Sequence, residues 1–143
     1  MANLDAKTYA SQSASTTAGF PVAPKKLYKV ESTYTYAGTE DVADVIRIVT
    51  LPANTTVVPQ LSTIKTTENI TIDLGHGGDA DAYVNDFDCT TAINGLWTAT
   101  GSLGAEATVP VLKTGSYNVQ ATVVASGSVG TTDVIFGVVY EAQ

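Results

Sequence analysis

The chain of 143 residues is the size of one domain, and 44% of its residues are hydrophobic while only 15% are charged. Its single cysteine, Cys89, excludes an internal disulfide, and no apolar run approaches the ~18 residues that a membrane helix needs. The formal net charge of −7 argues against nucleic acid as a partner, because affinity for nucleic acid comes from neutralising phosphates.

Residues 1–26 predict an extended arm in front of a domain that spans residues 27–143. The arm is rich in Ala, Ser and Thr and has no apolar signal-peptide core, so we expect synthesis in a cytoplasm without secretion. The first 30 residues carry four lysines and one aspartate, which gives +3 and leaves −10 for the remainder. Either the arm frays, or it orders on an acidic protein surface with Phe20 and Val22 as anchors.

Residues 27–36 predict the first strand of the domain. Tyr28, Tyr34 and Tyr36 share one face, and charged or threonine side chains occupy the other. A stripe of this kind is typical of a strand with one packed face, although tyrosines are also enriched at interfaces.

Three further strands are predicted within residues 44–74, with a break at Pro52–Asn54 between the first two. The last one, residues 69–74, alternates apolar and polar side chains with the period of a half-buried strand. Arg47, the only arginine, is either a buried or interfacial ion-pair partner or an exposed residue on a sheet edge.

Residues 79–89 are acidic and irregular, which predicts a short helix or a loop. Calcium binding is one reading, but the spacing of the oxygen ligands does not match an EF-hand. The alternative is a solvated acidic loop with Tyr83 and Phe87 packed inward.

The C-terminal third predicts a short strand at residues 93–99, an edge strand at 107–113 bent by Pro110, and two long strands at 117–125 and 133–141. A Gly/Ser turn separates the two long strands, which predicts a hairpin. The chain thus has seven to nine short strands, and we predict an all-β, antiparallel, jelly-roll-like sandwich.

Catalytic and cofactor motifs are missing from the sequence. His76 is the only histidine, no G-x-S-x-G or phosphate-loop pattern occurs, and one His with one Cys does not make a zinc site. We therefore expect no enzymatic activity, cofactor or metal. A glycan-cleaving enzyme would need a pair of carboxylates, which an acidic loop alone does not specify.

Three stretches give the chain a resemblance to a known group of proteins: DVIRIVTLPAN at residues 44–54, ITIDLG at 70–75 and GDADAY at 78–83. With the Val-rich segment at residues 134–140, they resemble small virion proteins of tailed bacteriophages, of the head decoration (cement) type. The resemblance extends from Asp41 to the C-terminus.

The resemblance implies a sandwich on the outer surface of the phage head, often a homotrimer, that braces neighbouring major capsid proteins and has no catalytic residues. Synthesis would take place in the host cytoplasm. On this chain we expect the capsid or subunit contacts at Phe20, Val22, Lys25, Lys26, Tyr28, Tyr34, Tyr36 and Arg47. The alternative is a tail or fibre module that binds host glycan through exposed aromatics, for which Trp97 and Tyr83 are the candidates.

Overall fold

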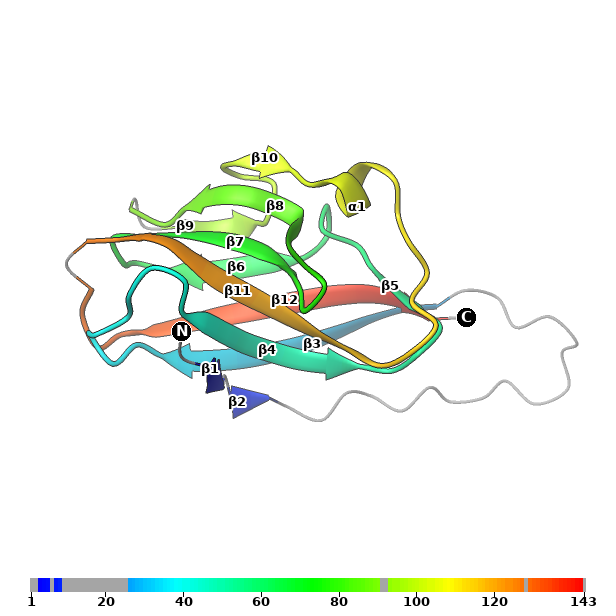
Figure 1. The fold of residues 1–143 in the computed structure, drawn as a ribbon, viewed down its shortest axis with the longest axis horizontal. Helices are drawn as coiled ribbons and strands as arrows, with labels where there is room; N and C mark the ends of the chain where they lie inside the picture. Colours follow the sequence, from blue (N-terminus) through cyan, green and yellow to red (C-terminus); the bar gives the residue numbers. More distant parts are fainter. Residues whose placement is uncertain (1–2, 6, 9–25, 91–92, 128, 143) are drawn as a thin grey trace, which may run out of the picture.

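A computed structural model describes residues 3–5, 7–8, 26–90, 93–127 and 129–142, which form two β-sheets packed face to face (Figure 1). The first sheet contains, in spatial order, β1 (Asn3–Asp5), β4 (Val45–Leu51), β11 (Tyr117–Ser126), β7 (Ile70–His76), β8 (Asp79–Asp88) and β10 (Ser102–Leu103). The second contains β2 (Lys7–Thr8), β3 (Lys26–Thr35), β12 (Asp133–Ala142), β6 (Thr63–Thr66) and β9 (Ile93–Leu96), with β5 (Thr55–Val57) also paired to β12. The single helical turn described is α1 (Ala105–Thr108), and no helix in this part of the chain is long and apolar enough to span a membrane.

The strand order is that of a jelly roll. Without the short strands β1, β2, β5 and β10, one sheet runs β3-β12-β6-β9 and the other runs β4-β11-β7-β8. Numbered along the chain, these orders are 1-8-3-6 and 2-7-4-5, the arrangement of a Greek-key sandwich in which long connections cross between the sheets. The predicted antiparallel, jelly-roll-like sandwich is confirmed.

The predicted hairpin between the last two strands is wrong. β11 pairs with β4 and β7, whereas β12 lies in the opposite sheet and pairs with β3, β5 and β6. Alternating apolar residues show that a strand has a buried face but do not specify its neighbour. The connecting loop instead binds the loop before β7, because Gly127 N–H donates to the Asn69 carbonyl and Gly130 N–H to the Glu68 carboxylate, 2.8 Å away.

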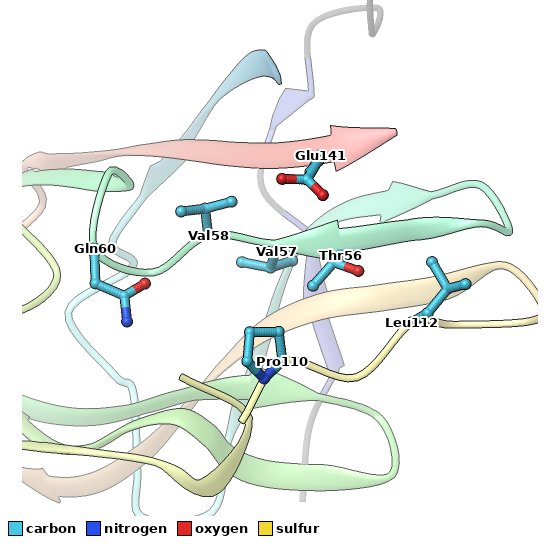
Figure 2. A pocket seen from close by; sticks show the side chains of 7 residues that line it. All are labelled: Thr56, Val57, Val58, Gln60, Pro110, Leu112 and Glu141. Atoms are coloured by element: carbon cyan, nitrogen blue, oxygen red, sulfur yellow. The ribbon is translucent and has the colours of Figure 1, made fainter. Parts of the chain in front are cut away.

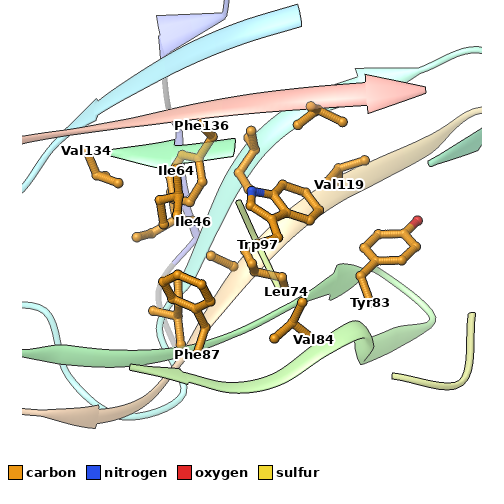
Figure 3. Packing of buried hydrophobic residues seen from close by; sticks show 14 of the residues in the cluster. Ile46, Ile64, Leu74, Tyr83, Val84, Phe87, Trp97, Val119, Val134 and Phe136 are labelled. Atoms are coloured by element: carbon orange, nitrogen blue, oxygen red, sulfur yellow. The ribbon is translucent and has the colours of Figure 1, made fainter. Parts of the chain in front are cut away.

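The core between the sheets is filled by the strand faces that the sequence predicted to be apolar. Ile70, Ile72 and Leu74 of β7 are all buried, as their alternation indicates. Figure 3 shows Trp97, which follows β9, in the middle of this layer among side chains from both sheets. Its indole is fully buried, and the Nε1–H donates to the Thr63 carbonyl at 2.9 Å.

Two segments differ from their predicted conformations. Residues 79–88 form the ten-residue strand β8, with register shifts against β7 and a positive φ of 56° at Asp86. These irregularities put three consecutive buried residues at positions 82–84, so the period of two is lost from the sequence. Residues 107–113 do not form the predicted edge strand: they run from α1 into a segment that joins the sheets through an isolated bridge between Lys113 and Thr55.

The start of the chain lies along one edge of the sandwich. Residues 3–5 pair in parallel with β4, and residues 7–8 pair antiparallel with β3, so this short stretch contributes to both sheets. Residues 9–25, which hold most of the predicted arm, are outside the described residues.

Candidate interaction surface

The predicted contact residues differ in their burial. Phe20, Val22 and Lys25 are outside the described residues. Lys26 and Tyr28 are half-buried on β3, where the Tyr28 ring stacks on Tyr140 with centroids 5.5 Å apart. Arg47 is exposed on β4.

Tyr34 and Tyr36 are core residues, and this corrects their assignment to a contact surface. Their exposed fractions are 7% and 1%, and their rings pack edge to face at 5.5 Å. The Tyr34 hydroxyl donates to the Glu40 carboxylate at 2.6 Å. The alternating tyrosines of this strand were compatible with core packing or with an interface, and core packing applies to both Tyr34 and Tyr36.

The features proposed for glycan and calcium binding also have structural roles. Trp97 and Tyr83 are buried and stack with centroids 6.2 Å apart, so neither presents a face to a ligand. Phe87 is buried as well, which confirms that Tyr83 and Phe87 pack inward. Among the described residues, no group of three His, Cys, Asp or Glu side chains is placed to hold a metal ion.

Large apolar side chains are exposed at one end of the sandwich. Among the described side chains, eight large hydrophobics are exposed, and three of them lie in the consecutive run Val109, Pro110, Val111 and Leu112. This run, the apolar loop, connects α1 to the segment before β11. Val109, Val111 and Leu112 are 70%, 45% and 42% exposed, so this run is a contiguous apolar patch on the surface.

A groove of about 430 Å³ lies between the apolar loop and β5 (Figure 2). Pro110 and Leu112 line one side, whereas Val109 and Val111 are not among its lining residues. All four residues of the loop are exposed to solvent. The remaining lining residues are Thr56, Val57, Val58, Gln60 and Glu141.

Two exposed leucines extend this apolar surface. Cross-strand pairing aligns Leu27 of β3 with Glu141 of β12, and Glu141 with Thr56 of β5, so these three side chains share one sheet face. Leu61 follows the groove residue Gln60. Five of the eight exposed large hydrophobics thus lie on the apolar loop or beside its groove.

Hydrogen bonds fix the apolar loop at both ends. Before the loop, the Gln60 side-chain amide donates to the Ala107 carbonyl at 2.8 Å. After it, Lys113 N–H donates to the Thr55 carbonyl and Asn54 N–H donates to the Lys113 carbonyl, at 3.2 and 2.7 Å. The loop is therefore held in place on the sandwich although its side chains are exposed.

An ion cluster of His76, Glu106 and Lys113 closes the base of the apolar loop. Glu106 Oε1 lies 2.5 Å from Lys113 Nζ, and its Oε2 lies 2.6 Å from His76 Nε2. The three side chains are only 12–17% exposed. Burial acts to raise the pKa of Glu106, but the hydrogen bonds from His76 and Lys113 outweigh it and lower that pKa.

Both ring nitrogens of His76 have partners. Gly78 N–H donates to Nδ1 at 3.1 Å, whereas Nε2 lies 2.6 Å from Glu106 Oε2 and 3.1 Å from Lys113 Nζ. The imidazole therefore links the turn after β7 to the ion pair. The sequence predicted His76 as a turn residue but gave no sign of this cluster, because Glu106 and Lys113 are 30 and 37 residues away.

Comparison with known proteins shows a protein chain of similar fold. No family model matches the chain, and no curated protein matches it. A chain from the solved structure "Cyanophage Pam1 capsid asymmetric unit" is similar, with 21% sequence identity and a TM-score of 0.58. The match covers 94% of this chain and 99% of the other, so the two share the whole sandwich rather than a part of it.

Proposed function

We propose that the chain is a virion structural protein of a tailed bacteriophage and, more specifically, a decoration protein on the outer surface of the head. The observation that carries this proposal is the full-length match to a chain from a cyanophage capsid asymmetric unit. The resemblance of residues 44–54, 70–75 and 78–83 to small phage virion proteins points to the same role.

The proposed partners are the major capsid protein and further copies of this chain, in a homotrimer. Bracing needs extended surfaces rather than a pocket, and a trimer that contacts several capsid subunits at once gains avidity without strong individual contacts. The role involves no catalysis, nucleic acid or membrane.

The capsid-facing side is proposed to be the sandwich edge at which β1 pairs with β4 and β2 pairs with β3. Lys26 and Tyr28 lie on β3 and Arg47 lies on β4, and the first residues of the chain pair with both strands at this edge. Phe20, Val22 and Lys25 lead directly into β3. Their apolar and cationic side chains complement an acidic protein surface that has apolar hollows.

Co-sedimentation with heads that lack this chain tests the proposal. Replacing Phe20 and Val22 by Ser, which leaves the paired residues 3–5 and 7–8 in place, should give a folded body that binds heads poorly. Val42→Ser is the matched control, because Val42 is an exposed apolar residue in the loop between β3 and β4. If the F20S/V22S variant binds heads as well as the wild type does, the arm does not contribute to head binding. If the wild type does not bind, the decoration role is overturned.

A further inference from the structure

We propose that the outer edge of β9, together with a cationic hollow beside it, binds an extended acidic segment of a partner protein. β9 is the last strand of the second sheet, at the end opposite to β2 and β3. The site is therefore separate from the edge proposed to face the capsid, and binding to it is measurable on the purified chain with no phage head present.

The outer edge of β9 presents backbone groups that a further strand can pair with. In the described part of the chain, β9 pairs only with β6. Trp97 N–H donates to the Ser62 carbonyl at 2.9 Å, which fixes the phase of this ladder. Because successive residues of a strand point their N–H groups to opposite sides, those of Asn94 and Leu96 face the outer edge. An edge of this kind is a template for the backbone of an added strand.

A hollow of about 300 Å³ lies beside this edge, lined by Asn94 of β9 and by residues of β3, β6 and β12. Gly137 of β12 is the neighbour of two lining residues, Glu31 and Thr63. A Cβ at Gly137 would come within 2.7 Å of Lys29 Cε, so the missing side chain lets Lys29 lie across β12. The hollow thus exists because a glycine occupies the middle of a strand.

The hollow is cationic although the chain is acidic. Lys65 is exposed and forms no ion pair with any described residue, and Lys29 lies 3.7 Å from Glu31 in a pair that is about half exposed. Two lysines and one glutamate line the hollow, which gives +1 and leaves −8 for the rest of the chain. Charge complementarity therefore favours a carboxylate as the group that enters it.

The register of β9 combines the two features into one ligand. Lys65 is directly opposite Asn94, so a residue that pairs with Asn94 from an added strand lies in the same cross-strand row as Lys65. A Glu side chain at this position can extend over Asn94 towards the lysine. On the other face of β9, Ile93 packs against the core, which favours apolar residues at the alternate positions of the added strand.

Fluorescence anisotropy with a short labelled peptide of alternating Glu and Val tests the proposal. The wild type should bind this peptide and should not bind a Lys/Val peptide of equal length. Lys65→Glu should raise the dissociation constant at least about tenfold, because a carboxylate replaces the cation. The control V42E/S116E makes the same change in net charge at exposed positions before β4 and β11, and should leave binding unchanged. No binding by the wild type, or equal binding by K65E, overturns the proposal.

Strand pairing is tested separately from charge. Asn94→Pro removes an N–H group from the outer edge but none from the ladder with β6, and it should abolish binding. A Glu/Val peptide that is N-methylated at its Glu residues should not bind the wild type, and this result does not depend on how N94P folds. Polygalacturonate, which has carboxylates but no peptide backbone, should compete poorly. Equal binding of the methylated peptide, or competition by polygalacturonate as strong as that by unlabelled Glu/Val peptide, would contradict strand addition.

Discussion

Glu106 and Lys113 form an ion pair with 2.5 Å between oxygen and nitrogen, and this pair closes a loop of six residues that exposes Val109, Val111 and Leu112. Both charged side chains are largely buried, so each depends on the other for compensation. The stability of this end of the sandwich and the presentation of its apolar surface are thereby coupled.

Breaking this pair from one side should be costly. We expect Glu106→Gln or Lys113→Met to lower the free energy of unfolding by about 2–3 kcal/mol, because the remaining partner is left buried and uncompensated. Urea unfolding at pH 7 measures this, and amide exchange should rise at residues 107–113. The double variant E106Q/K113M should be less destabilised than the sum of the two, and strictly additive effects would show that the pair is not coupled.

Acid should weaken the two loops held by Glu40 and Glu68. Burial acts to raise the pKa of Glu40, but hydrogen bonds from Tyr34 and from the Ala37 and Gly38 N–H groups lower it overall. The hydroxyl of Thr132 and then the N–H of Gly130 lower the pKa of Glu68. A folded-state pKa below the ordinary value of 4.5 means that both carboxylates stabilise the fold at neutral pH.

This stabilisation should be lost as the pH falls from about 5 through 4.5 towards the folded-state pKa values. Urea midpoints measured between pH 7 and pH 3 should therefore drop, and Glu68→Gln should flatten the drop while lowering stability at pH 7. The exposed Glu31→Gln is the control and should leave the profile unchanged. An acid profile identical in E68Q and wild type would contradict the role of Glu68.

Trp97 should be the most sensitive position in the core. Trp97→Ala should cost about 3–5 kcal/mol, since it leaves a cavity between the sheets and removes the donor to the Thr63 carbonyl. Trp97→Phe keeps an aromatic ring and should cost less. Because this is the only tryptophan, its emission should be blue-shifted in the native protein and shift to the red on unfolding. Native emission at the wavelength of exposed indole would contradict the burial of this side chain.

Cys89 should be unreactive in the folded protein. Its thiol is buried, and burial, with a smaller effect of Asp88, raises the pKa to about 12. At pH 8 the thiolate is therefore scarce as well as inaccessible. A chromogenic disulfide reagent should label Cys89 only after urea is added, and rapid labelling without denaturant would contradict the structure.

The fold class was predictable from segments with periodic apolar residues. Strands with irregular pairing, and the assignment of strands to sheets, were not predictable. β3, β4 and β7 were recognisable because their apolar residues face one core, as Ile70, Ile72 and Leu74 show. β8 was missed because its bulges remove the alternation. The opposite sheets of β11 and β12 were missed because a Gly/Ser turn permits a hairpin and a crossing connection equally.

The surface features were less predictable than the strands. The apolar loop reads as an edge strand in sequence, and only the fold shows that the side chains flanking Pro110 remain exposed. The ion cluster joins residues from β7, α1 and the segment before β11, and no local spacing relates His76 to its partners. The alternation of Tyr34 and Tyr36 in the sequence is the same whether their strand face is packed or exposed. Only their burial in the structure assigns them to the core.

Cryo-electron microscopy of the purified protein mixed with undecorated phage heads tests the decoration role most directly. The account predicts ordered density for the sandwich on the outside of the shell, with the edge where β1 and β2 pair with β4 and β3 facing the major capsid protein. Bare shells, together with localisation of the chain to the tail in intact virions, would contradict it.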